Sequence, residues 1–167
     1  MAQQKEIKYD LDGYDIITNA LMTLLNQYPD LGSDKIRFST FATESGIAMF
    51  PSIGAVVETE RRSVTGKVYQ NCNYPFNIVY KVAGVSESNK IQVKDFLDKL
   101  GKWLEMQPVT IGTQVYKLEA YPTLTDNREI TSISRTTPAY LESVEENKTE
   151  NWVISMILRY KNEYCNY

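Results

Sequence analysis

The sequence predicts an α+β fold: a mainly antiparallel β-sheet with two amphipathic helices packed on one face and a long hairpin extension. Three observations support this class. Residues 151–164 alternate between two faces as a strand does, and residues 14–27 and 90–106 each carry a helical stripe. The other strand-like segments occur in groups instead of alternating singly with helices, which is typical of α+β proteins.

The closing segment, 151–164, gives the strongest strand signal. One of its faces would carry five large apolar side chains, namely Trp152, Ile154, Met156, Leu158 and Tyr160. The other face begins apolar and becomes charged, as expected for a strand with one buried and one partly solvated side. A helix is the alternative, because Trp152, Met156 and Tyr160 also recur every four residues. Alternation over five consecutive pairs favours the strand.

The first helix is predicted over residues 14–27. A stripe two residues wide follows one helical face and consists of Ile16, Ile17, Ala20, Leu21, Leu24, Leu25 and Tyr28. Asp12 is the expected N-cap, with Asp15 as the acidic half of a capping box. Pro29 should end the helix, because the residue before a proline is pushed out of the helical region.

The second helix is predicted over residues 90–106. Its stripe consists of Val93, Phe96, Leu97, Leu100, Trp103 and Leu104, and Ser88 and Asn89 are both good caps. Gly101 lies inside this helix, where glycine costs stability, so it marks a close approach of another element.

The remaining strands are short or interrupted. We expect them at 36–41, 46–50, 55–62, 75–85, part of 109–120, and 130–134. Strands 55–62 and 75–85 should pair, and residues 63–74 between them are too many for a tight turn. That long hairpin loop is either two strands that extend past the sheet or a mobile loop. Residues 135–150 should be a loop or one irregular helical turn.

Composition indicates one ordinary globular domain that spans residues 1–167, with a flexible start at 1–9. Hydrophobic residues make up 43% of the chain and charged residues 23%. A net charge of −3 argues against a general nucleic-acid binder, which needs a basic excess. No apolar run approaches the roughly 20 residues of a membrane helix, and the first residues lack a signal-peptide core. The chain is therefore expected in the cytoplasm of the cell that makes it.

The sequence contains few residues or motifs that indicate catalysis or cofactor binding. It has no histidine, which removes the commonest general base and metal ligand, and the two cysteines, Cys72 and Cys165, are read as unrelated thiols. No phosphate-binding glycine motif occurs. Asp10 and Asp12 are read as capping residues rather than as an acid–base pair. No cofactor and no metal is expected, although a hydrolase that works with carboxylates alone stays open.

Polar and aromatic residues suggest contact surfaces instead. Arg61 and Arg62 lie beside Glu58 and Glu60, which fits either a salt-bridged sheet edge or a contact to a partner or to passing nucleic acid. Twelve tyrosines are many for 167 residues, and tyrosine is enriched at interfaces. The candidate interface residues are Arg61, Arg62, Lys67, Tyr69, Asn71, Asn73, Tyr74, Tyr140 and Tyr164.

Three stretches carry a resemblance to a known family: GYDIITNALMTLLNQYP, SGIAMFPSIGAVVETERRSVTGKVYQNCNYPFNIVYKV and ITSISRTTPAYLESVEENKTENWVISMILRYKN. Over about 12–162 the chain resembles the minor capsid proteins of tailed phages of Gram-positive hosts. That family is similar in turn to the siphophage tail terminator. The resemblance rests on overall pattern, without an invariant chemical motif, and transfers no site residue.

The resemblance implies a structural virion protein without catalysis. Its subunits would form a ring, expected to be a hexamer, that caps the tail tube and joins it to the head, with DNA passing through the lumen. Expected partners are further copies of the chain, the tail tube protein, and a head-completion or connector protein. The location would be the neck of the virion, and the host cytoplasm during assembly. The alternatives are a connector on the portal side of the same neck and a small carboxylate-based hydrolase.

Overall fold

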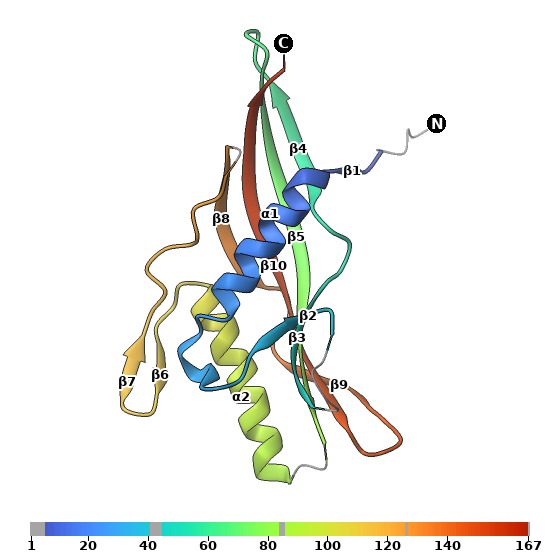
Figure 1. Cartoon of the computed structure of the whole chain (residues 1–167), viewed down its shortest axis with the longest axis vertical. Coiled ribbons are helices and arrows are strands. Elements are labelled where there is room, and N and C mark those ends of the chain that lie inside the picture. The colour runs from blue at the N-terminus through green and yellow to red at the C-terminus, as the bar shows by residue number, and fades with distance from the viewer. Residues whose placement is uncertain (1–5, 41–44, 84–85, 126, 167) are drawn as a thin grey trace.

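The computed structural model describes residues 6–40, 45–83, 86–125 and 127–166. It has two α-helices and a mostly antiparallel sheet, which confirms the predicted α+β class (Figure 1). Of the start predicted to be flexible, residues 1–5 lie outside the described part. Within the described ranges, neither helix is both long and apolar enough to cross a bilayer.

The sheet is built around one long antiparallel pair. Strands β5 (Lys67–Val82) and β10 (Glu150–Cys165) have 16 residues each and pair from end to end, from Glu150 opposite Val82 to Cys165 opposite Lys67. The alternation in the closing segment therefore predicted β10 correctly. In Figure 1 the two strands form a twisted ribbon that runs the length of the molecule. We call this pair the central ribbon.

Other strands flank the two halves of the central ribbon. One half lies between β4 (Val56–Arg62) and β8 (Arg128–Arg135), and the other half between β3 (Gly46–Pro51) and β9 (Tyr140–Val144). Outside these, β1 (Lys8–Tyr9) pairs with β4, and β2 (Ile36–Phe38) runs parallel to β3. A separate small hairpin consists of β6 (Val109–Ile111) and β7 (Gln114–Tyr116).

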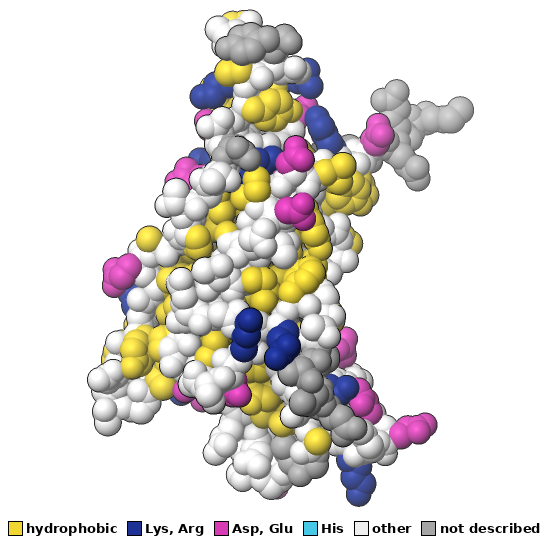
Figure 2. Space-filling model, viewed as in Figure 1, with side chains coloured by type: hydrophobic (Ala, Val, Ile, Leu, Met, Phe, Trp, Pro, Cys, Tyr) yellow, Lys and Arg dark blue, Asp and Glu magenta, His cyan; other side chains and the backbone are white. Residues whose placement is uncertain are grey.

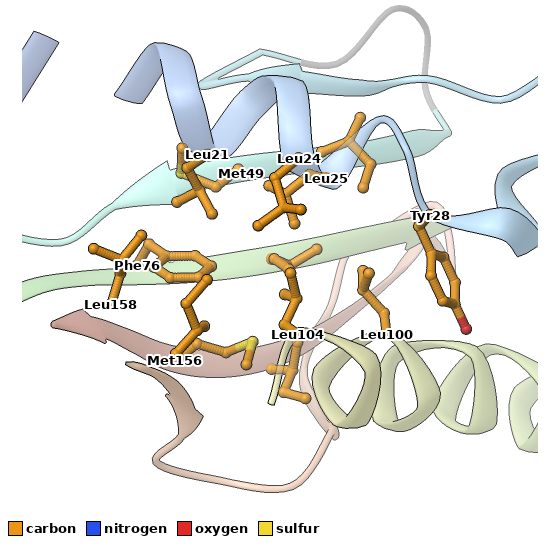
Figure 3. Packing of buried hydrophobic residues seen from close by; sticks show 14 of the residues in the cluster. Leu21, Leu24, Leu25, Tyr28, Met49, Phe76, Leu100, Leu104, Met156 and Leu158 are labelled. Carbon is orange, nitrogen blue, oxygen red and sulfur yellow. The ribbon is translucent and has the colours of Figure 1, made fainter. Parts of the chain in front are cut away.

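Both helices pack on the same face of the sheet (Figure 1). They are α1 (Leu11–Leu25), which is followed by a 3-10 turn at Pro29–Leu31, and α2 (Glu87–Leu104). Figure 3 shows Leu21 and Leu24 of α1 and Leu100 of α2 meeting side chains of the ribbon, such as Phe76 and Met156. The predicted helical and strand stripes thus meet in one core.

Gly101 is the close approach that the sequence indicated. A Cβ atom added there would lie 2.7 Å from Cδ1 of Ile154 and 2.8 Å from Cδ of Arg135. Only glycine lets α2 lie this close to β10 and β8 without moving a neighbour. The close packing of α2 on β10 and β8 therefore requires glycine at this position, although glycine has a low helix propensity.

The predicted boundaries need four corrections. The N-cap of α1 is Asp10 and not Asp12, and α2 begins after Ser86 rather than after Asn89. The region expected to be a loop or a helical turn contains β9, which forms a hairpin with β10. Most of the predicted 63–74 loop is the start of β5, so the reading as two extended strands holds and the reading as a mobile loop is wrong.

Candidate assembly surfaces

A short turn closes the far end of the central ribbon, between β4 and β5. The backbone N–H of Ser63 donates to the carbonyl of Lys67 at 2.8 Å, and Ser63 Oγ accepts from the N–H of Lys67 at 3.0 Å. Gly66 has a φ of +86°, a left-handed conformation that suits glycine. The N–H of Asn166 donates to the Gly66 carbonyl at 2.8 Å, so the end of the chain braces the turn. We call residues 61–69 together with 163–166 the ribbon tip.

The ribbon tip carries cations held against an aromatic ring. The guanidinium of Arg61 lies 4.7 Å from the centre of the Tyr69 ring, and the ammonium of Lys67 lies 5.0 Å from it. Lys67 also pairs with Glu163 at 3.4 Å, and this contact raises the pKa of the lysine. Figure 2 shows Lys and Arg side chains on both sides of the tip, at the top of the view. The tip thus presents ordered positive charge to solvent.

No helix of the described part covers the sheet face opposite α1 and α2 (Figure 1), and the part of this face toward the ribbon tip is polar. Arg159 and Lys161 of β10 are exposed on this face, next to Asn71 and Asn73 of β5. Neighbouring strands order two of these side chains. Asn71 donates to Oγ1 of Thr59 at 2.9 Å, and Arg159 donates to Oγ of Ser134 at 3.0 Å. Toward the ribbon tip this face offers hydrogen-bonding groups and positive charge, whereas toward β3 and β9 it carries apolar residues such as Ala48, Val79 and Val153.

A buried ionic cluster fixes the start of α1 on the sheet. Arg128 Nη2 donates to Oδ1 of Asp10 at 2.8 Å and Arg128 Nε to Oδ2 at 3.0 Å, while the Tyr160 hydroxyl donates to Oδ2 at 2.6 Å. The N–H of Gly13 donates to Oδ1, which is the N-cap bond. Burial alone would raise the pKa of Asp10, but these four donors together lower it below its usual value of 3.8.

A polar cleft of about 750 Å³ lies beside this cluster. Its lining includes Lys8, Gln70, Asn162 and Tyr164. Asn162 donates to Gln70 at 3.1 Å, Gln70 donates to Glu60 at 2.8 Å, and Lys8 donates to Glu60 at 2.7 Å. Because these side chains hydrogen-bond to one another, we interpret the cleft as a polar region that continues the core toward the ribbon tip.

The structure places eight of the nine predicted interface residues in three groups. Arg61, Arg62, Lys67, Tyr69 and Tyr164 lie at or beside the ribbon tip, and Asn71 and Asn73 lie on the uncovered face. Tyr140 lies at the other end of the molecule on β9 and is 40% exposed.

Tyr74 is a correction, because it was expected to be exposed. It is completely buried, and its hydroxyl shares a 2.8 Å hydrogen bond with Thr18 Oγ1 of α1. Burial raises its pKa to about 12. Its position on the inner face follows from the period of β5, in which Tyr74 shares a face with Phe76 and Ile78. Extending the predicted strand 75–85 backwards would have found this.

Sequence reasoning missed the roles of Arg128 and Tyr160. Asp10 was recognised as a capping residue, but its partners lie 118 and 150 positions away in the chain. Nothing local in the sequence signals pairing at such distances. In the described residues, no three His, Cys, Asp or Glu side chains gather in a way that could hold a metal ion. Comparison with protein-family models and with curated proteins finds no match to this chain.

Proposed function

We propose that this chain is a ring-forming structural protein of a tailed phage neck, a tail terminator. In this role it caps the tail tube and joins it to the head while DNA passes through the ring. The sequence resemblance supports this proposal. The shape of the molecule supports it as well, because ordered polar side chains lie on the projecting strands and on the open sheet face.

The observation that carries the proposal is the projecting central ribbon. Near the start of α1 its inner face changes from large apolar side chains to the Gln70–Asn162 pair, Val68 follows, and the ribbon ends in the cationic tip. A ribbon that extends beyond its own core gives the monomer little hydrophobic stabilisation. Such a ribbon offers ordered backbone and side-chain groups to another protein, as a joint between the ring and the tube requires.

The charge distribution suits transport of DNA through a ring. A net charge of −3 disfavours tight, general binding to phosphates. The few cations of the uncovered face, Arg159 and Lys161, would give only brief contacts. The proposed location is the virion neck, reached from the host cytoplasm during assembly.

Native mass measurement and negative-stain microscopy test the proposal. The purified chain is examined alone, with polymerised tail tube protein, and with DNA-filled heads from a tailless mutant. We expect one discrete multiple of the 19.2 kDa chain, seen as a ring that binds tube ends. Binding to heads alone would favour the portal-side connector instead. A monomer that binds neither particle would refute a role in the neck.

Charge reversal tests the role of the ribbon tip. Deletion of residues 66–73 would not test the tip alone, because Val68, Gln70 and Cys72 of this segment are buried and their loss would disturb the fold. Arg61→Glu with Lys67→Glu reverses the tip while leaving the buried residues in place. Lys102→Glu, an exposed change on α2, is the matched control. We expect the tip variant to keep its ring and to lose binding to tubes, whereas the control keeps both. Full tube binding by the tip variant would show that the tip is not the joint.

A further inference from the structure

A hollow of about 430 Å³ opens to solvent beside α2, where the helix meets the 3-10 turn after α1 and the end of β5 away from the ribbon tip. Its walls are mainly apolar, and a few polar side chains stand among them. Pockets of this size and composition are characteristic of binding sites. We call it the α2 pocket, and its lining includes Asp30 of the turn, Tyr80 of β5, and Val93, Asp95 and Phe96 of α2.

Aromatic rings hold one wall of the α2 pocket in place. The Phe96 ring meets the Tyr80 ring edge to face, with 5.5 Å between their centres and 88° between their planes. It also meets the Tyr28 ring edge to face at 5.6 Å, and Tyr28 packs in turn on Trp103 at 5.4 Å. Because these rings come from α2, β5 and the segment after α1, the wall is rigid. Such a wall suits an aliphatic chain and attracts a cation placed near a ring face.

The charged side chains in the lining of the α2 pocket, Asp30 and Asp95, are both acidic. Within the described ranges, no lysine or arginine lies at ion-pair distance from Asp30. Asp95 uses Oδ2 to pair with Lys99 at 3.1 Å, and its side chain is more than half exposed. Each carboxylate can therefore accept a further hydrogen bond from a ligand.

The cations around the α2 pocket are engaged elsewhere. Lys90 and Lys94 of α2 each pair with a carboxylate outside the lining, at 3.3 and 2.7 Å. Lys35 and Arg37 line a separate hollow that shares only two residues of β5 with the α2 pocket. The α2 pocket therefore keeps a negative potential, which favours a cationic ligand over a neutral or anionic one.

A buried hydroxyl near the two carboxylates provides an independent observation. Tyr28 is only 3% exposed, and its hydroxyl has no hydrogen-bond partner in the part of the chain that the structure describes. Figure 3 shows this hydroxyl pointing toward α2. Burial raises the pKa of Tyr28, and the charges of Asp30 and Asp95 raise it further, so the hydroxyl lies near both carboxylates. Buried hydroxyls are normally hydrogen-bonded, and a ligand ammonium group in the pocket would supply the missing donor.

We propose that the α2 pocket binds a primary ammonium group on an aliphatic stem. The stem lies against Val93 and Phe96, and the ammonium group meets the carboxylates of Asp30 and Asp95. A lysine side chain of a partner protein and a free alkyl diamine both carry this chemistry, and a titration with each of them separates the two sources. The inference rests on the pocket alone and is independent of the neck role.

Titrations followed by two-dimensional amide NMR test the site. The probes are N-acetyl-lysine N-methylamide, its neutral isostere N-acetyl-norleucine N-methylamide, and cadaverine. We expect the cationic probes to give saturable shifts of the Tyr80 and Phe96 amides and of the Trp103 indole N–H, and the isostere to give none. Tighter binding of the lysine derivative assigns the site to a partner's side chain, and tighter binding of cadaverine assigns it to a free amine. Equal shifts with the isostere, or no saturable shift up to about 10 mM, would overturn the proposal.

Charge removal at constant size tests whether the two carboxylates bind the ligand. Asp30→Asn/Asp95→Asn removes both pocket charges from exposed positions, so the fold should be kept. Two exposed ion pairs correspond to about a tenfold change in affinity, so the lysine derivative should bind about tenfold more weakly. Asp12→Asn/Asp15→Asn, which removes two exposed carboxylates of α1 outside the pocket, is the matched control and should leave the affinity unchanged. Equal affinities of these two double variants would refute binding at the α2 pocket.

Discussion

Substitution of Asp10 by alanine should destabilise this protein more than any surface change. Arg128 would remain buried without the carboxylate that faces it, since both side chains are only 7% exposed. Removal of one partner of a buried ion pair costs about 3–5 kcal/mol, and the lost N-cap contributes about 1 kcal/mol of the same effect. We expect a loss of about 3 kcal/mol, the lower end of the range, because solvent in the adjoining cleft can reach the freed guanidinium.

Urea unfolding at pH 7, followed by circular dichroism, measures this loss. Asp10→Ala is compared with Asp10→Ala/Arg128→Met, in which the buried cation is also replaced by an apolar chain. The double variant should be more stable than the single one, because most of the cost comes from burying the Arg128 charge without the Asp10 carboxylate rather than from the missing hydrogen bonds. Tyr160→Phe removes one bond to a charged group and should cost about 1.5 kcal/mol. Tyr140→Phe, on the exposed strand β9, is the control and should change stability by under about 0.5 kcal/mol.

The pH dependence of the free energy of unfolding tests the direction of the pKa shift of Asp10. Because the folded state lowers the pKa of Asp10, its contribution is fully present above the unfolded value of 3.8 and is lost as the pH falls through the lower folded pKa. The difference between the wild type and Asp10→Ala should therefore be constant near neutrality and shrink below pH 3.8. A loss under about 1 kcal/mol at pH 7, or a difference that grows in acid, would refute the role assigned to this cluster.

Two further predictions concern the core and the thiols. Gly101→Ala should destabilise the protein by about 1 kcal/mol in urea unfolding, because the added Cβ would press on Ile154 and Arg135. This cost should outweigh the better helix propensity of alanine. A gain in stability would mean that α2 can move away from β10. Cys165 should react with a thiol reagent at pH 8 in the native protein, whereas Cys72 should react only after unfolding. The reason is that burial raises the pKa of the Cys72 thiol to about 11. Equal rates for the two thiols in the native state would contradict the burial of Cys72.

Periodicity predicted the elements that bury one whole face. The central strand β10 and both helices were found because their apolar residues repeat over more than ten positions. Gly101 was also interpreted correctly, since a single glycine inside a helical pattern has few explanations other than the close approach of another element. These features depend only on residues that are close in sequence, so local reasoning is sufficient for them.

Sequence reasoning failed where a strand changes its surroundings along its length. For the first half of β5 the sequence does not decide between an extended strand and a mobile loop, because Gln70, Asn71 and Asn73 interrupt the apolar pattern. In the structure Gln70 is buried against Asn162 and Glu60, so a polar residue occupies an inner position. Likewise β9 is exposed throughout and shows no alternation. Only the partner strand β10 makes it a strand, and a local pattern cannot indicate that partner.

The change of the inner face from apolar to polar also explains how the ribbon can project. Near the helices the ribbon is held by side chains such as Phe76 and Met156, and toward the tip by the chain of hydrogen bonds that links Asn162, Gln70 and Glu60. An apolar ribbon of the same length would expose a hydrophobic surface and aggregate. At the tip, Arg61 and Lys67 lie over the Tyr69 ring and Val64 is fully exposed, so the projecting end of the ribbon combines positive charge with a single exposed apolar side chain.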